Sequence, residues 1–501
     1  MNAHINIIPL FVIIPLAGAF LTSLIGRFCK KLSDLIGNVV TMTLFMFSLY
    51  AVYMANKFQV LVYEVGGWRP PFGISLVLDG LSGFMLVTIN LIAFMITIFA
   101  INYMEKFTTK WKFYTLFLLM LAGMNGVVIT GDIFNLFVFL EIASVASYAL
   151  VAYGTEMDEL EAAFKYTVMS SVASIFVLLA IGILYAYAGT LNMADLAGYL
   201  SQIPNAIVIK FVMILLIMGF GLKAAIVPFH AWLPDAHPSA PAPISAALSG
   251  VVIKALGIYS LVRIFYNIFG VRQEMLNIFA FLGVLSLMVG VLLAIGQWDL
   301  KRLLAYHSIS QVGYIMLGIG LGTPLGILGG LFHLFNHSVF KSLLFLTSGS
   351  VEYTTGTRNL EEMGGLREKL PVTANTNFIA SMSIAGIPPF NGFWSKLVII
   401  LACLQAGKPG YALWAVVGSI LTLSSFMKVQ KYAFFGKLKE KYTNLKEVPV
   451  FMTTAMIVLA IVCIIGGILI LPGVERLFIQ PAVDIVVQGA KYKDIVMGAL
   501  R

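Results

Sequence analysis

Charged residues are scarce in this sequence of 501 residues. Only 11% of them are Asp, Glu, Lys or Arg, whereas 60% are hydrophobic and the mean hydropathy is +0.94. A soluble domain of this length carries roughly twice that share of charge. The composition therefore excludes an ordinary soluble protein and predicts a polytopic membrane protein.

Cysteine and cofactor motifs are equally scarce. Cys29, Cys403 and Cys463 are scattered without a C-x-x-C spacing, so we expect neither disulfides nor a metal cluster. The sequence has no G-x-x-x-x-G-K-[ST] and no H-E-x-x-H motif, which argues against an ATPase or a metal hydrolase. The net charge of +9 comes from short basic loops between apolar runs, so it indicates topology. We expect no cofactor, no resident metal and no nucleic-acid partner.

Apolar runs long enough to cross a bilayer recur along the whole chain. A spanning helix needs about 20 mostly apolar residues, and fourteen runs satisfy this, which predicts an all-α fold with about fourteen transmembrane helices. Their centres lie near residues 15, 46, 90, 120, 141, 176, 217, 253, 286, 311, 339, 388, 422 and 461. The stretch 475–501 is amphipathic and is expected to lie along the surface.

Lysine and arginine are unevenly divided between the predicted loops. If the N-terminus lies outside, the inside loops hold 18 of the 32 Lys and Arg residues, and the outside loops before the C-terminal tail hold 6. Cytoplasmic loops are the ones enriched in these residues. Arg27, Lys30 and Lys31 follow the first apolar run and no charge precedes it, unlike a signal peptide. We expect a multi-pass protein of a bacterial or archaeal plasma membrane with its N-terminus outside.

Four lysines remain at membrane depth: Lys223, Lys254, Lys341 and Lys396. A lysine at mid-bilayer costs about 2.5–3.5 kcal/mol on insertion scales, so each is a candidate for function. Snorkelling near a helix end is the alternative, above all for Lys341. Glu141 is the one acid predicted deep in a helix, and a carboxylate that moves relative to an ammonium changes how firmly that ammonium holds its proton. We predict that Glu141 and Lys223 form a protonation switch.

Two of these lysines stand beside predicted helix breaks. Pro228 follows Lys223, and Pro388 and Pro389 precede Lys396. Proline removes a backbone donor and crowds the preceding turn, so each site breaks or kinks its helix. A plain proline kink is the alternative, whereas broken transmembrane helices are a recurrent ion-site device in transporters.

The two breaks fall in predicted helices 7 and 12. They lie five spans apart, and an odd number of spans inverts orientation, so we predict two inverted five-helix repeats. The predicted division is 1–105 for helices 1–3, 110–268 for the first repeat (helices 4–8), 273–436 for the second (helices 9–13), and 447–501 for helix 14 and the tail.

Histidines accompany the lysines. His333, His337 and Lys341 are spaced i, i+4, i+8, so they line one helical face over about 12 Å. Single buried histidines are usually hydrogen-bonded core residues, but three titratable groups in register favour a proton relay. His307 has Ser308 and Gln311 beside it, which can hold the water that a proton path needs.

Polar residues near the predicted helix ends are secondary candidates. Asp132 lies nine residues before Glu141, as a helix cap or an entrance residue. His230, Asp235 and His237 occupy a proline-rich inside loop. A metal site is one reading of that loop, and a polar lid or a proton entrance is the other.

Several segments resemble one family of membrane proteins. They are "TGDIFNLFVFLE", "GFGLKAAIVPFHAWLPDAHPSAPAPISA", "KRLLAYHSISQVGY", "HSVFKSLLFL" and "GIPPFNGFWSK". With them, essentially the whole chain resembles the antiporter-like subunits of respiratory complex I and of Mrp-type multisubunit Na+/H+ antiporters. It is most similar to the D subunits of Mrp antiporters and their counterparts in archaeal membrane-bound hydrogenases and sulfane reductases.

The resemblance implies fourteen helices, inverted five-helix repeats, broken helices 7 and 12, and one proton pathway per subunit. It places the family's helix-5 glutamate on Glu141, its helix-7 and helix-8 lysines on Lys223 and Lys254, its helix-11 histidine on His337 and its helix-12 terminal residue on Lys396. Some members have glutamate at that last position.

The chain also differs from some family members at Gln311, where those members have histidine. Without that histidine, a proton relay past this position must use water or His307.

These observations predict a proton-translocating subunit of a larger membrane complex, with other membrane subunits, some of them related to this chain, as partners. Protons, with or without sodium ions, are the expected substrates, and the lipid bilayer is the expected surroundings. A self-sufficient secondary Na+/H+ antiporter is one alternative, although sodium prefers a carboxylate-rich site and only Glu141 and Asp132 are candidates. A redox-active quinone or hydrogen oxidoreductase subunit is another, against which the missing cluster ligands argue. Whether the complex itself is an oxidoreductase is left open.

Overall fold

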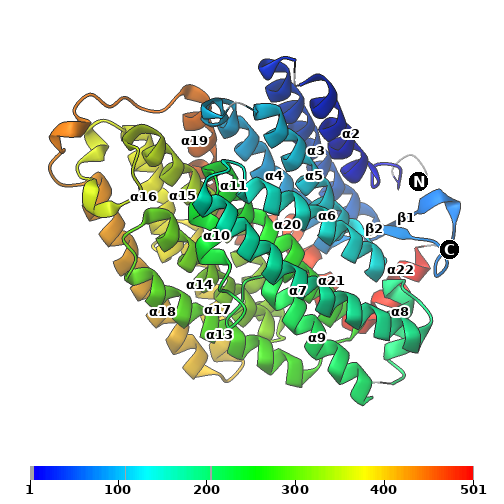
Figure 1. Cartoon of the computed structure of the whole chain (residues 1–501). Helices are drawn as coiled ribbons and strands as arrows, with labels where there is room; N and C mark the ends of the chain where they lie inside the picture. The colour runs from blue at the N-terminus through cyan, green and yellow to red at the C-terminus, as the bar shows by residue number, and fades with distance from the viewer. Residues whose placement is uncertain (1–4, 27, 108, 204–205, 500–501) are drawn as a thin grey trace.

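A computed structural model describes residues 5–26, 28–107, 109–203 and 206–499. Long helices run side by side in one bundle (Figure 1). They are α2 (Leu10–Ile25), α3 (Lys30–Phe58), α4 (Gly80–Tyr103), α5 (Lys110–Ile129), α6 (Ile133–Val151), α7 (Met157–Ala188), α9 (Ile207–Lys223), α13 (Gln273–Ile295), α14 (Leu300–Gly320), α15 (Pro324–Thr355), α16 (Pro371–Ala385), α17 (Asn391–Gln405), α18 (Pro409–Val429) and α19 (Val450–Ile465).

Shorter helices complete the chain. Between α9 and α13 lie α10 (Leu233–Ser239) and one continuous helix made of α11 (Ala242–Ala247), η3 (Leu248–Tyr259), α12 (Ser260–Val262) and η4 (Arg263–Ile268). The others are η1 (Val65–Gly67), η2 (Met104–Lys106), α8 (Met193–Leu200), η5 (Leu360–Glu362), η6 (Leu366–Glu368), η7 (Gln430–Phe434), η8 (Glu440–Tyr442), η9 (Gly466–Ile470), α20 (Val474–Phe478), α21 (Gln480–Gln488), η10 (Gly489–Lys491) and α22 (Tyr492–Gly498).

The helices agree with the prediction of a polytopic membrane protein. Among the described residues, nine helices are long and apolar enough to span a bilayer, and α2 and α17 are shorter apolar helices. Thirteen of the fourteen predicted centres fall inside helices. The remaining one, residue 388, falls in the break between α16 and α17, where prolines were expected to interrupt the chain.

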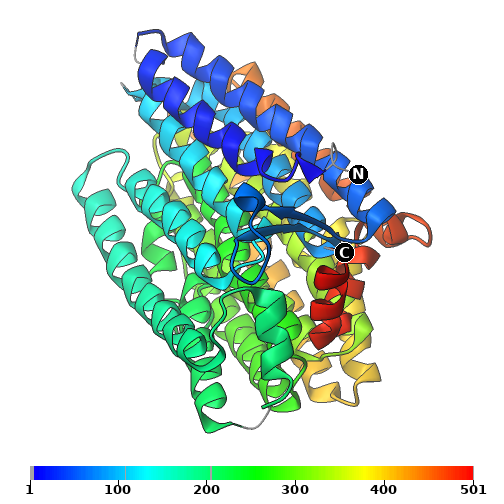
Figure 2. The same ribbon diagram turned by 90° about the vertical axis from the view of Figure 1, so that its right-hand side faces the viewer.

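The prediction of a purely helical fold is wrong at one place. Strands β1 (Leu61–Glu64) and β2 (Ser75–Leu78) form an antiparallel pair that follows α3 (Figure 2). Their connection holds Gly66 and Gly67, both at positive φ, which suits glycine because it has no Cβ. Four-residue strands are too short to stand out beside apolar runs of 20 residues, so the helical signal masked them.

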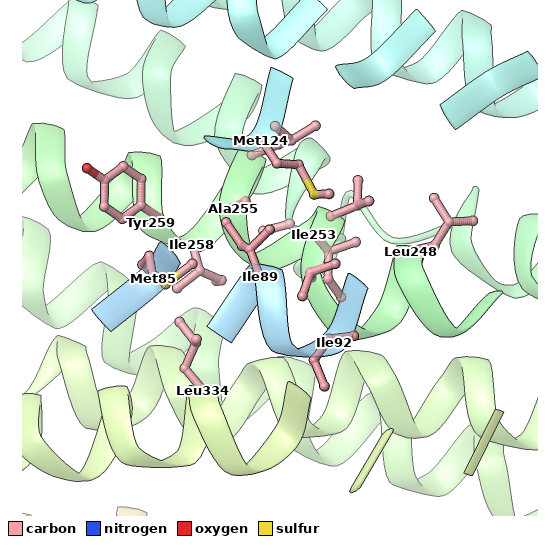
Figure 3. Close-up of a cluster of buried hydrophobic side chains, with 14 of the residues drawn as sticks. Met85, Ile89, Ile92, Met124, Leu248, Ile253, Ala255, Ile258, Tyr259 and Leu334 are labelled. Atoms are coloured by element: carbon pink, nitrogen blue, oxygen red, sulfur yellow. The ribbon is translucent and has the colours of Figure 1, made fainter. Parts of the chain in front are cut away.

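The continuous helix 242–268 forms the centre of the bundle and is wholly buried. Figure 3 shows its apolar side chains meeting α4, α5 and α15, as Ile253 and Ile258 lie near Ile89 and Leu334. Much of this helix is wound as a π-helix, with i→i+5 hydrogen bonds. Its position brings the two halves of the chain together around its side chains.

The connections between helices gather at two opposite ends of the bundle. At the end that we call the Asp299 face, Asp235 binds Lys165 (3.2 Å) and Arg302 (3.4 Å), and Arg358 binds Asp299 (3.2 Å). These pairs join connections that the sequence placed on the inside.

The other end, which we call the hairpin face, carries β1, β2, α8 and the C-terminal helices (Figures 1 and 2). There the side chain of Asn192 donates to Ser75 (3.1 Å), and Asn267 donates to the carbonyl of Ile485 in α21 (2.7 Å). The C-terminal tail lies along this end, as expected, with Val483 and Val486 buried.

Candidate functional site

The first predicted break lies where the sequence placed it. Helix α9 ends at Lys223, five residues before Pro228. The backbone groups that the break frees find side-chain partners: Trp232 Nε1 donates to the Leu222 carbonyl (3.0 Å), and the Val227 N–H donates to Ser286 Oγ (3.0 Å). Irregular backbone at membrane depth is therefore satisfied by protein, and Lys223 is held at the end of a helix.

Lys223 and Glu141 form an ion pair with a Nζ to Oε1 distance of 3.4 Å. The lysine Nζ also donates to Ser144 Oγ (2.9 Å) and Ser170 Oγ (2.6 Å), and Ser174 Oγ donates to Glu141 Oε1 (2.5 Å). The lysine side chain is 2% exposed and that of Glu141 is 31% exposed. One partner is thus inside the bundle and the other reaches the outer surface of α6.

The second break, between α16 and α17, surrounds Lys396. Gly386 turns the chain at a positive φ of 81° after α16 ends. The buried Lys396 Nζ donates to the freed carbonyl of Ile384 (2.7 Å) and to Ser419 Oγ (3.0 Å), and it lies 4.6 Å from the centre of the Tyr314 ring. A cation at a helix C-terminus is favoured by the helix dipole, yet no carboxylate among the described residues pairs with it.

Lys254 lies in the middle of the central helix and is 0% exposed. Its Nζ donates to the carbonyl of Ser249, one π-helical turn earlier. The neighbouring hydroxyl of Ser249 lies 2.8 Å from that of Ser308 in α14. Lys254 is therefore a buried cation whose hydrogen-bond acceptor is a neutral carbonyl, which is a costly arrangement for a residue with only a structural role.

Three of the predicted titratable residues lie together on α15. His333, His337 and Lys341 are all buried on this helix, and the two histidine rings lie 6.2 Å apart. His333 Nδ1 lies 2.9 Å from Ser395 Oγ in α17. Both ring nitrogens of His337 and the Lys341 Nζ have no hydrogen-bond partner in the described chain. The snorkelling alternative for Lys341 is wrong, because its side chain is fully buried.

These buried groups lie in series on helices that pack against one another, because the central helix contacts α6, α9 and α15, and α15 contacts α17. His337 lies within electrostatic reach of Lys254, Lys341 and Lys396 as well as His333. The series runs from Glu141 on α6 through the central helix to α15 and α17. Partnerless polar groups in a protein interior are rare, so their concentration here marks this part of the bundle as the candidate site.

The secondary candidates take different positions. Asp132 accepts a hydrogen bond from the Asn135 N–H (2.7 Å) and caps α6, which is one of the two positions expected for it, and desolvation raises the pKa of its carboxyl. His307 Nε2 lies 2.8 Å from Ser425 Oγ, while its Nδ1 and both polar atoms of the buried Gln311 are partnerless in the described part of the chain.

The proline-rich loop does not gather a metal site. No group of three His, Cys, Asp or Glu side chains suited to a metal occurs among the described residues. Asp235 pairs with two cations at the Asp299 face, His230 is half-buried, and His237 is fully buried against Phe345.

Sequence reasoning missed three ion pairs whose cations are buried. Arg263 of η4 binds Asp79, the cap of α4, through two hydrogen bonds of 2.7 and 2.8 Å. Lys301 binds Glu352 at 2.7 Å, and Lys110 binds Asp34 at 2.7 Å. These residues lie near helix ends, so a hydropathy pattern assigns them to loops. A charge inside a helix near a span boundary is the only sequence signal that they carry.

The fold and this buried series define an antiporter-like membrane subunit, and the family model agrees. The model described as "NADH:quinone oxidoreductase/Mrp antiporter, TM" matches residues 130–422, and one described as "NADH-Ubiquinone oxidoreductase (complex I), chain 5 N-terminus" matches residues 67–114. The chain belongs to the NADH:quinone oxidoreductase/Mrp antiporter transmembrane family.

Curated relatives come from both branches of this family. The chain is 37% identical to the NADH-quinone oxidoreductase subunit N of Desulforudis audaxviator, with 88% of each chain covered. It is 36% identical to the D subunit of the Na(+)/H(+) antiporter of Alkalihalophilus pseudofirmus, with 88% of this chain and 90% of the relative covered.

Two solved structures share the fold over nearly the whole chain. A chain of the Mrp complex from Dietzia sp. matches with a TM-score of 0.90 and 28% identity, covering 99% of this chain and all of that one. A chain of the membrane-bound sulfane sulfur reductase, an archaeal respiratory membrane complex, matches with a TM-score of 0.89 and 31% identity, covering 98% and 99%.

Proposed function

We propose that this chain moves protons across a membrane as one subunit of a multisubunit complex. The path consists of Glu141, Lys223, Lys254, His337, Lys341 and Lys396, with Asp132, His230, His307 and His333 as secondary positions. The observation that carries the proposal is the ion pair of Glu141 and Lys223 at one end of a buried series of lysines and histidines.

The ion pair can act as the switch of this path. An opposite charge nearby favours the charged form of a lysine, and desolvation favours its neutral form. Both effects act on Lys223. Its side chain is 2% exposed, which favours the neutral form, and Glu141, its only carboxylate partner in the described chain, favours the charged form. Moving Glu141 away tips Lys223 toward releasing its proton to Lys254, and the return of Glu141 resets the pair.

The proposed fold has fourteen spans and two inverted repeats. Matching turns at the two faces support the repeats. Asp132 bridges Asn192 at the hairpin face, and Asp299 bridges Asn359 at the opposite face. Each aspartate caps a long helix, each asparagine caps a short one, and the two partners stand 60 residues apart in both pairs (132 to 192 and 299 to 359). The same turn on opposite faces is what an inverted repeat produces.

Helices α7 and α15 extend this correspondence. Each has 32 residues and ends at a left-handed glycine, Gly189 or Gly356. When the two helices are aligned on these glycines, Ser170 of α7 takes the same position as His337 of α15. In the same alignment, Ser174 takes the position of Lys341. The repeats then comprise 110–268 and 273–436, flanked by 1–105 and 447–501, and the same helix of each repeat faces the proton path.

Other membrane subunits are the proposed partners, as in the complexes of the structural relatives. Glu141 is 31% exposed on an α6 surface whose neighbours Phe134 and Val145 are exposed and apolar. A carboxylate facing lipid is costly, so an adjoining subunit is the favourable neighbour for it. We place the protein in the plasma membrane with the Asp299 face and its basic connections inside and the N-terminus outside. Sodium ions are a second substrate of such a complex.

The substitution Glu141→Gln in the intact complex tests this proposal. It removes the charge that acts on Lys223 and keeps the size of the side chain, so we expect proton transport in proteoliposomes to stop while the complex still assembles. Glu440→Gln, which changes an exposed acid of η8, is the matched control. Transport at the wild-type rate by the Glu141 variant would falsify the switch.

A further inference from the structure

A vestibule opens at the Asp299 face above the proton path. Its volume is about 480 Å³, and it is lined by acidic residues that include Glu156, Asp158 and Glu159 and by residues 239–241. At its wall, the 2% exposed side chain of Lys301 pairs with Glu352 at 2.7 Å. Lys301 Nζ also donates to the carbonyl of Ala240 (3.1 Å), the residue that follows α10, so this ion pair is tied to the C-terminal end of that short buried helix.

His237 lies in α10, three residues before Ala240. It is 0% exposed, and neither of its ring nitrogens has a hydrogen-bond partner in the described chain. The His237 ring stacks on that of Phe345, with centroids 4.8 Å apart. The Lys341 Nζ lies 5.5 Å from the centre of the Phe345 ring. A buried imidazole without partners is exceptional among folded proteins, and this one shares an aromatic neighbour with a partnerless lysine.

The charged groups around His237 are cations from three different elements. Lys341 of α15, Lys254 of the central helix and Lys301 of α14 lie within its electrostatic reach. The first two belong to the proposed proton path, and the third belongs to the vestibule wall. His237 is therefore the titratable group that stands between the cavity and the path.

We infer that the vestibule is the proton uptake site and that His237 passes protons from it to Lys341, with the Lys301–Glu352 pair controlling access. Water in the vestibule delivers a proton to one ring nitrogen of His237. The resulting imidazolium releases a proton from its other nitrogen to the neutral amine of Lys341, so His237 returns to its neutral form. Glu352 compensates the charge of Lys301, which otherwise repels the incoming proton. This inference rests on the proposed function.

The two partners of the ion pair give the sharpest test, because their single substitutions have opposite consequences. In the intact complex in proteoliposomes, Glu352→Gln leaves an uncompensated cation at the mouth, so we expect transport to slow at least about tenfold. Lys301→Met removes that cation and is expected to keep or raise the rate. Glu362→Gln, an exposed acid on the same face, is the control. Equal losses in both variants indicate a structural pair and overturn the access role.

His237 is tested by chemical rescue. We expect His237→Ala to slow transport at least about tenfold and added imidazole to restore it, which a purely structural histidine would not show. If the alanine variant does not assemble, His237→Gln replaces it and must be slow. A normal rate in either variant, or an assembled alanine variant that imidazole does not rescue, overturns the relay.

Lys254→Ala in the same vesicles separates this inference from the proposed function. An inactive Lys254→Ala beside a normal His237→Ala contradicts the uptake route alone. A normal Lys254→Ala contradicts the proton path itself.

Discussion

Lys223 and Glu141 are 3.4 Å apart, yet one is enclosed by the bundle and the other reaches its surface. The hydroxyls of Ser144 and Ser170 hold the lysine, and that of Ser174 holds the glutamate. This asymmetry allows a neighbouring subunit to act on the carboxylate while the lysine stays in place. A change at a subunit boundary is thereby converted into a change of proton affinity inside the chain.

The serine partners of this pair have a measurable share in its action. Ser170→Ala removes the 2.6 Å hydrogen bond to Lys223 and leaves Ser144 and Glu141 in place. A hydrogen bond to a charged group contributes about 1.5–3 kcal/mol, so we expect proton transport about tenfold slower, but not abolished. The rate in proteoliposomes checks this, with the exposed Ser201→Ala as control. An unchanged rate would show that Ser170 does not contribute to the switch.

Lys254 is expected to be a residue whose removal harms function and not stability. Its ammonium is buried with a carbonyl as its contact, and a lysine at membrane depth costs about 2.5–3.5 kcal/mol on insertion scales. Lys254→Met relieves that cost, so we expect thermal unfolding of the complex at the same or a higher temperature and no proton transport. Lys446→Met, at an exposed position, is the control. A clear loss of thermal stability would assign Lys254 a structural role.

The matching turns of the two halves predict that each asparagine cap stabilises the chain. The side chain of Asn192 caps α8 and that of Asn359 caps η5, through hydrogen bonds of 3.1 Å. Loss of an asparagine cap costs about 1 kcal/mol, so Asn359→Ala is expected to lower thermal stability slightly. Asn192→Ala is expected to lower it more, because the buried Asn192 side chain also donates to Ser75. Thermal unfolding of the purified chain measures both. A large loss in one variant and none in the other would count against equivalent turns.

The sequence predicted the parts of the fold that depend on hydropathy and on proline. The helices, the end of α9 at Lys223 and the common face of His333 and Lys341 follow from apolar length, from the missing proline N–H and from the 3.6-residue period. These are local properties, so one chain segment is enough to read them.

The features that the sequence did not predict depend on contacts between distant segments. Arg263 pairs with Asp79, 184 residues away, and nothing near either residue indicates the other. The residues around Lys254 are wound as a π-helix, which is rare and which no local pattern in the sequence indicates. The sequence assigned His237 to a loop, and only the fold shows that it is buried beside Phe345.

Internal pH during an imposed sodium gradient tests the central claim most directly. Proteoliposomes are prepared with the purified chain alone and with the complete complex that contains it. We predict no coupled exchange by the chain alone and rapid exchange by the complex, because the switch at Glu141 needs a neighbouring subunit to move it. Robust exchange by the isolated chain would contradict this account and identify a self-sufficient antiporter.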